Sequence, residues 1–277
     1  MGVVIKCVKG EEMDQESIIR KYKLNELSDI LDAIEDDIAQ AIIEKKIMEQ
    51  RDYSNFLLNV LGKSIVTFRE CICLCENGFP DGALSLARNI YEQFIHTLYM
   101  ESKIEADFEL LLQKYFDDHT VKRAKALRFE AEKINHDQNA VKMYEEQRNR
   151  IRNKYNIKEL KDYWWSGCQS FGDMCDIVAK HSKAEENITR CMHFFYLRAC
   201  TSLHAGCLGN RLRIGSYFQG IDMGPWDSGQ EDSLFLAIMS LLRIVQFTYK
   251  NIGISENENI DGIYKLAIYY SEMVFEV

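Results

Sequence analysis

The segment LNELSDILDAIEDDIAQAIIEKKIM, residues 24–48, decides the fold class of this chain. Apolar residues recur in it at intervals of three and four, the spacing that lines one side of a helix packed against another helix. The side opposite the apolar one is acidic, so we expect it to face water. The segment therefore predicts a long heptad helix whose partner belongs to this chain or to a second copy. The apolar positions are Leu24, Leu27, Leu31, Ile34, Ile38 and Ala41, and the acidic ones are Glu26, Asp29, Asp32, Glu35, Asp36 and Asp37.

The rest of the chain extends the helical pattern. Its 277 residues include only 2 prolines and 15 glycines, and 47% are hydrophobic. That leaves little of the turn chemistry that a many-stranded β-protein needs between its strands. We therefore expect an all-α protein, a helical bundle with a long N-terminal heptad helix and a glycine-rich loop before two C-terminal helices.

The same periodicity predicts the order of the helices and the domains. The turn Asn77-Gly78-Phe79-Pro80-Asp81 separates two of the helices, since glycine suits a left-handed C-terminal position and proline cannot continue a helix. We expect an N-terminal packing or dimerisation arm over 1–52 and a bundle domain over 53–277. The predicted helices are 53–76, 82–102, two within 105–160 with a break near 135–137, 171–181, 188–208, 231–249 and 260–275, and the glycine-rich loop is 209–230.

Cysteine usage and hydropathy predict a cytoplasmic protein. No stretch approaches the ~20 consecutive apolar residues that span a bilayer, so no membrane partner is expected. The nine cysteines are odd in number and scattered, as expected of reduced thiols. Cys200, His204 and Cys207 have the spacing of one helical stripe, but no fourth ligand is apparent for a structural metal. We expect neither a metal nor a cofactor.

Charge is distributed unevenly along the chain. The net charge is −9, yet residues 119–158 hold eleven Lys/Arg against five Asp/Glu. The basic helix within this region includes Arg148, Arg150 and Arg152. This pattern is typical either of a solvated, ion-paired helix face or of a surface that binds phosphate.

Two charged residues fall within a strongly apolar helix. Arg88 and Glu92 are four positions apart, so their side chains meet on one face. An unpaired charge in such surroundings costs several kcal/mol. We therefore predict that they pair with each other, either to fix helix packing or to orient a charged group in a site.

The segment YLRACTSLH, residues 196–204, carries a second motif. Arg198 and His204 form an R-x5-H pattern, which resembles the signature of the HEPN superfamily of helical proteins. This resemblance implies a metal-independent endoribonuclease, of the kind found in toxin–antitoxin and phage-defence systems. On an ideal helix these two residues are about 120° apart, so a helix start, a kink or a dimer interface is needed to bring both to one phosphate.

The HEPN resemblance also implies roles for residues. His204 would act as general base or acid, and Arg198 would bind the scissile phosphate. Tyr196 and Ser202, together with the Arg88–Glu92 pair, would support the site. The implied partners are RNA, a second copy in a homodimer and a protein encoded nearby. The residues assigned to RNA binding are Arg211, Arg213, Arg148, Arg150 and Arg152.

Other segments are similar to an uncharacterised family of bacterial helical proteins. They are the turn that leads into residues 87–92, the cluster Trp164-Trp165-Ser166-Gly167, and the end of the R-x5-H segment. Together they cover about residues 55–210, which would be the HEPN-like core.

Two further interpretations stay open. The chain could be a non-catalytic interaction or sensor module that presents the heptad helix and Trp164-Trp165 to a partner. It could also bind a nucleotide or another small ligand, with Tyr91, Trp164, Trp165 and Trp226 as stacking surfaces.

Overall fold

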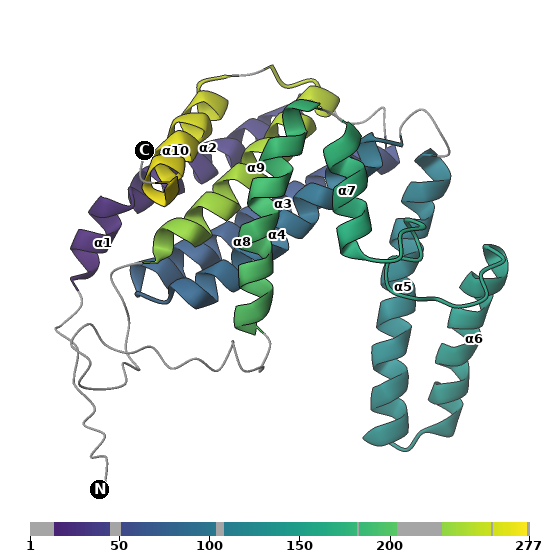
Figure 1. The fold of residues 1–277 in the computed structure, drawn as a ribbon. Coiled ribbons are helices and arrows are strands. Elements are labelled where there is room, and N and C mark those ends of the chain that lie inside the picture. The colour runs from purple at the N-terminus through teal and green to yellow at the C-terminus, as the bar shows by residue number, and fades with distance from the viewer. Residues whose placement is uncertain are drawn as a thin grey trace, which may run out of the picture. The chain divides into compact units, whose positions relative to one another are not determined.

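A computed structural model of the chain describes residues 14–44, 51–103, 108–181, 183–203, 229–255 and 257–275. Over these ranges it has ten helices and no strand, which confirms the predicted all-α class (Figure 1). The helices are α1 (Gln15–Lys21), α2 (Leu24–Ile43), α3 (Arg51–Glu76), α4 (Pro80–Glu101), α5 (Phe108–Lys133), α6 (Gln138–Lys154), α7 (Phe171–His181), α8 (Lys183–Leu203), α9 (Gln230–Ile252) and α10 (Glu258–Phe275).

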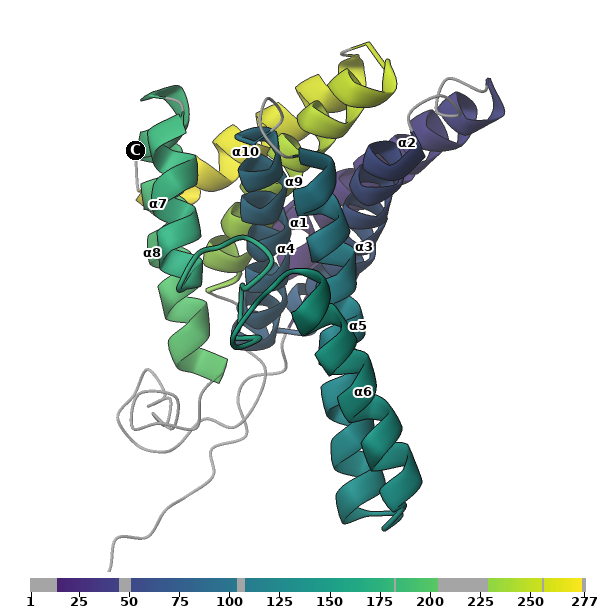
Figure 2. The ribbon, with the colours of Figure 1, turned by 90° about the vertical axis from the view of Figure 1, so that its right-hand side faces the viewer.

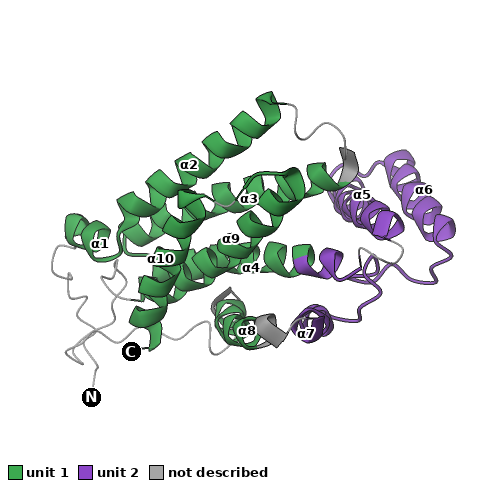
Figure 3. Cartoon of the chain, turned by 90° about the horizontal axis from the view of Figure 1, so that it is seen from above, with its two compact units in different colours: residues 1–97, 187–277 green, residues 98–186 purple. Residues whose placement is uncertain are grey.

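The chain divides into two compact units, coloured separately in Figure 3. Unit 1 comprises residues 1–97 and 187–277, and unit 2 comprises residues 98–186. The N-terminal and C-terminal parts of the chain thus share one core, while unit 2 is a single stretch of sequence. The predicted loop 209–230 lies outside the described residues except for its last two positions.

The core of unit 1 is built around α9, which contacts α3 and α10 along its length. Phe235 of α9 packs edge-on against Phe195 of α8, with 5.2 Å between ring centroids, and against Phe275 of α10 at 5.6 Å. The helix α4 is also strongly apolar, but α9 has the larger share of buried residues. By length and composition α9 could cross a membrane, yet 78% of its apolar window is buried inside the protein, as in a core helix.

The heptad helix α2 finds its partners within this chain. Its apolar positions Leu24, Leu27, Leu31 and Ile34 are buried, and the helix packs on α3 and α10. One acidic residue departs from the predicted solvent-facing side. Asp37 accepts hydrogen bonds from the Tyr249 hydroxyl at 2.8 Å and from the side-chain amides of Asn257 and Asn259 at 2.7 and 2.8 Å. It therefore fastens α2 to the α9–α10 connection.

The predicted turn between α3 and α4 is confirmed. Gly78 has φ 73°, a left-handed value that glycine adopts without strain, and its N–H donates to the Cys75 carbonyl at 3.0 Å. The Phe79 N–H then donates to the Leu74 carbonyl at 2.8 Å, which closes the end of α3. Pro80 begins α4, so the chain reverses within three residues.

In unit 2, α5 and α6 form an antiparallel hairpin that both Figure 1 and Figure 2 show side by side. The predicted break near 135–137 is confirmed, and Asp137 caps α6 by accepting the backbone N–H groups of Asn139 and Ala140 at 3.0 and 3.1 Å. Trp165 is 2% exposed and packs edge-on against Tyr115, with 4.9 Å between ring centroids. It belongs to the core of unit 2, so it is not available as a partner or stacking surface.

Candidate functional site

A polar cluster lies between α4 and α8 in unit 1, and we call it the α4–α8 cluster. On α8 its members are three, then four, residues apart, so they share one stripe of the helix. On α4 they lie within one turn. The cluster consists of Arg88, Tyr91 and Glu92 from α4 and His193, Tyr196 and Cys200 from α8.

Glu92 is the acceptor that joins the two helices. Its Oε1 accepts a hydrogen bond from Arg88 Nε at 2.9 Å, which confirms the predicted pair, and another from the Tyr196 hydroxyl at 3.3 Å. The side chains of Arg88 and Glu92 are 25% and 24% exposed. The pair therefore lies at the edge of the core, where solvent or a ligand still reaches it.

The guanidinium of Arg88 is held in place through only one of its three nitrogens in the part of the chain that the structure describes. Burial alone would lower its pKa, but the adjacent Glu92 carboxylate raises it, so the guanidinium stays charged. Its central carbon lies over the Tyr196 ring, 5.5 Å from the centroid. Within the described ranges, only Nε makes a hydrogen bond, and the two terminal nitrogens have no protein acceptor. A fixed guanidinium with free terminal donors is suited to bind an anion.

His193 completes the cluster, and the sequence analysis missed it. Its ring stacks on Tyr196 with 5.4 Å between centroids and an interplanar angle of 21°. The Tyr91 hydroxyl lies 3.5 Å from His193 Nδ1 and 3.4 Å from the Thr189 carbonyl oxygen. The signal that could have found it is its spacing of three and seven residues before Tyr196 and Cys200. Tyr91 is fully buried, so it offers no stacking face to a ligand.

Tyr196 remains a neutral hydrogen-bond donor. Burial raises its pKa, and the Glu92 carboxylate raises it further. Its hydroxyl proton therefore stays in place to hold Glu92, while its ring contacts both Arg88 and His193. Tyr196 thus positions the two side chains that could act on an anionic ligand.

Arg198 lies elsewhere on α8. It follows Tyr196 by two residues, which turns it about 200° around the helix from the cluster. Its Nη1 forms an ion pair with Asp232 Oδ2 of α9 at 2.5 Å, and its side chain is 50% exposed while that of Asp232 is 16% exposed. Burial raises the pKa of Asp232, and Arg198 opposes that rise. The structure therefore does not bring Arg198 together with Arg88 and Glu92.

Several predicted site residues lie outside the described residues. These are His204, Arg211 and Arg213, together with the side chain of Ser202. That Arg198 and His204 act together on one phosphate therefore stays a prediction.

The three arginines of α6 do not share one face. Arg148 is half-buried, and its Nε is buried without a hydrogen-bond partner in the described part of the chain. Arg150 and Arg152 are exposed. Arg150 is turned about 200° from both of the others, so the predicted basic helix carries cations on two opposite sides.

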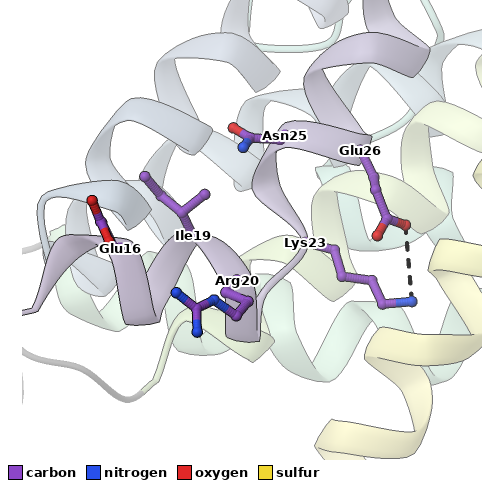
Figure 4. Close-up of a pocket in the computed structure, with 6 residues that line it drawn as sticks. All are labelled: Glu16, Ile19, Arg20, Lys23, Asn25 and Glu26. Carbon is purple, nitrogen blue, oxygen red and sulfur yellow. Dashed lines mark ion pairs between the residues drawn. The ribbon is translucent and has the colours of Figure 1, made fainter.

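A cavity with a volume of about 460 Å³ lies at the elbow between α1 and α2 (Figure 4). Its charged lining is balanced, with Glu16 and Glu26 against Arg20 and Lys23, and Lys23 pairs with Glu26 at 3.9 Å. It contains no histidine or cysteine. The α4–α8 cluster is therefore the better candidate for chemistry.

Comparison with known proteins places the cluster within a matched region. The profile of a family described as a family of unknown function, DUF5677, matches residues 54–217, a range that includes all six members of the cluster. No curated protein and no solved structure matches the chain significantly.

Proposed function

The chain belongs to DUF5677, a family of unknown function, and we propose that it is a metal-independent ribonuclease that acts through the α4–α8 cluster. The observation that carries the proposal is the hydrogen bonding of the Arg88 guanidinium. It is held through Nε by Glu92, and its terminal nitrogens remain without a protein partner in the described residues.

Phosphate binding follows from the geometry of Arg88. A guanidinium presents parallel N–H donors that match two phosphate oxygens, and it stays charged at any physiological pH. Charge grows on those oxygens as the phosphorane forms, so a pre-oriented donor stabilises the transition state more than the bound substrate. Glu92 and the Tyr196 ring supply that orientation.

Proton transfer is assigned to His193. In the proposed reaction the imidazole takes the proton of a ribose 2′-hydroxyl as that oxygen attacks the adjacent phosphorus. The bond from phosphorus to the 5′ oxygen breaks, and the 5′ oxygen takes a proton from water as it leaves. The products are a 2′,3′-cyclic phosphate and a 5′-hydroxyl, with no change in oxidation state.

The HEPN resemblance supports the same activity with other residues. It assigns phosphate binding to Arg198 and proton transfer to His204, and it implies a homodimer with a composite cleft. The two assignments share the reaction and differ in the arginine–histidine pair, so single variants distinguish them.

The test uses purified full-length protein, a 20-nucleotide RNA labelled at its 5′ end and a buffer containing EDTA. The variants are Arg88→Gln, His193→Gln, Arg198→Gln and His204→Gln, each checked for folding by thermal melting. We expect wild-type protein to leave 2′,3′-cyclic ends and the first two variants to lose cleavage. The matched control is His181→Gln, which changes an exposed histidine at the end of α7.

Each other outcome has a definite meaning. Loss of cleavage only in Arg198→Gln and His204→Gln keeps the activity but moves the site to the sequence motif. Absence of cleavage by a folded wild-type protein, at any protein concentration that forms dimers, contradicts the ribonuclease and favours a non-catalytic interaction module.

A further inference from the structure

A second polar cavity lies on the α5–α6 hairpin of unit 2, and its chemistry differs from that of the elbow cavity. It has a volume of about 360 Å³. Pockets for small ligands start at roughly 300 Å³, so the space fits one nucleotide-sized group. We call it the hairpin cleft. Its lining residues on α5 are His119, Thr120, Arg123, Ala124 and Leu127, and those on α6 are Met143, Tyr144 and Gln147.

The cleft has an apolar floor and a polar rim. Ala124 is buried, and Leu127 and Tyr144 are half-buried. Met143 is 46% exposed although it is a large apolar side chain. At the rim, His119 and Arg123 are exposed. An aromatic and aliphatic floor beside cations is the arrangement that holds a nucleotide by its base and its phosphate.

Arg150 extends the basic rim along α6. Met143, Gln147 and Arg150 are spaced four and three residues apart in a continuous helix, so they lie on one stripe. Arg150 is exposed. Cations from both helices, Arg123 on α5 and Arg150 on α6, therefore line the same side of the hairpin.

The cations of this side are not neutralised by the protein. Neither Arg123 nor Arg150 forms an ion pair with a carboxylate in the parts of the hairpin that the structure describes, although Glu146 is one turn before Arg150. The carboxylate of Asp117, nearer the base of the hairpin, is already occupied by Lys154 at 2.9 Å and by the Tyr155 hydroxyl at 2.6 Å. Other cations of the hairpin are paired, such as Arg128 with Glu145 at 3.1 Å.

We propose that the hairpin cleft binds one nucleotide of a single-stranded RNA, with its base on the Leu127–Met143–Tyr144 floor and its flanking phosphates on Arg123 and Arg150. Recognition of this kind tolerates any base sequence, because every base has a face to stack and every phosphate the same charge. The inference names a binding site for the substrate class of the proposed ribonuclease, and it rests on that proposal only for the biological role of the RNA.

The experiment measures binding without cleavage. Full-length protein is titrated into a fluorescent 12-nucleotide 2′-O-methyl RNA, which has no free 2′-hydroxyl, and anisotropy is followed at several salt concentrations. The test variant is Arg123→Gln/Arg150→Gln. The control is Lys125→Gln/Arg152→Gln, which removes the same charge from positions turned about 200° around the same two helices. Both are checked for an unchanged melting temperature.

We expect the test variant to bind at least tenfold more weakly at low salt. The slope of log K against log salt should also become shallower by about 1.4, since each phosphate contact to a single strand contributes about 0.7. The control should keep the slope of the wild type. A single-stranded DNA of the same sequence should bind with similar affinity, because neither floor nor rim depends on a 2′-hydroxyl.

Three outcomes would overturn the inference. The first is that both double variants weaken RNA binding equally, and the second is that the test variant keeps the wild-type salt slope. The third is that a polyglutamate peptide of the same charge binds as tightly as the RNA, which would indicate a surface that attracts any polyanion. The 2′-O-methyl RNA cannot be cleaved, so this experiment tests binding independently of cleavage. If the protein binds this RNA as expected but fails to cleave RNA in the ribonuclease assay, the proposed activity is rejected and the proposed binding site in the hairpin cleft is retained.

Discussion

Arg88 Nε donates to Glu92 Oε1 across one turn of α4, at 2.9 Å, and the same oxygen accepts the Tyr196 hydroxyl of α8 at 3.3 Å. One carboxylate oxygen thus orients a guanidinium and joins two helices. The relationship yields predictions for activity and for stability that can be separated by experiment.

The first prediction concerns the orientation of Arg88. Glu92→Gln keeps the shape of the side chain but removes the charge that holds Nε. If Glu92 positions Arg88, kcat for RNA cleavage should fall by roughly 10²-fold, within the range for losing one oriented transition-state contact. KM should change less than threefold. A rise in KM with an unchanged kcat would contradict a positioning role for Glu92.

The second prediction concerns the ion pair between Arg198 and Asp232. Arg198→Gln leaves a largely buried carboxylate without its partner, which should lower the free energy of unfolding by about 1–3 kcal/mol at pH 7. Adding Asp232→Asn should restore most of that loss, because the stranded charge is gone. Urea unfolding of the single and double variants measures both values.

The pH dependence of the Arg198→Gln variant follows from the pKa of Asp232. Burial already raises that pKa, and removing Arg198 raises it further. A carboxyl whose folded pKa lies above its unfolded pKa costs stability when ionised, and the cost disappears as the pH falls through the folded pKa. The deficit of Arg198→Gln should therefore be largest at pH 7 to 8 and shrink in acid. A deficit that is constant with pH would contradict this account.

The third prediction concerns Asp37. Burial would raise its pKa, but hydrogen bonds from Asn257, Asn259 and Tyr249 lower it overall. A carboxyl with a depressed folded pKa contributes stability above its unfolded pKa, near 3.9, and that contribution is lost as pH falls through the folded pKa. Asp37→Asn should therefore destabilise the protein by about 1 kcal/mol at pH 7, with water screening included.

Acid unfolding tests the Asp37 prediction. The difference between wild type and Asp37→Asn should begin to shrink as the pH falls below the unfolded pKa, near 3.9, and should vanish once the pH has passed through the lower folded pKa. Asp36→Asn is the matched control, since Asp36 is exposed on the same helix and should change stability by less than ~0.5 kcal/mol. If the two substitutions change the free energy of unfolding equally, the prediction is contradicted.

The fourth prediction concerns the core of unit 2. Trp165→Ala removes a buried ring that packs on Tyr99 and Tyr115, with centroid distances of 5.8 and 4.9 Å. The expected loss is about 3–5 kcal/mol, the usual range for truncating a buried aromatic. Hydrogen exchange should show it as faster exchange of amides in α5. Trp165→Phe should cost less, and a Trp165→Ala protein as stable as wild type would contradict the assignment of Trp165 to the core.

Much of the fold follows from periodicity alone. The seam of α2, the turn at Gly78 and the break near 135–137 were all predicted, because each depends on residues within a turn or two of one another. The prediction that Arg88 and Glu92 pair succeeded for the same reason, since four residues on a helix fix their distance. Geometry within one helix or one turn is determined by residues that are close together in the sequence.

Contacts between distant segments could not be read in this way. Nothing near Asp37 in the sequence indicates that Tyr249, Asn257 and Asn259 would surround it. His193 was overlooked because its neighbours Tyr91 and Tyr196 come together only when α4 packs on α8. Arg198 is turned about 200° from Tyr196 around α8, and its partner Asp232 belongs to a third helix, α9.

The sequence by itself determined that this protein is helical, where most of its helices begin and end, and which charges meet within one helix. Only the tertiary structure decided that α9 and not α4 is the most enclosed helix, that Trp165 is core, and that Arg88 and His193 share the Tyr196 ring. The physical reason is the range of the interactions. Helix formation depends on residues within four positions, whereas a site depends on which faces of separate helices hide their apolar surface against each other.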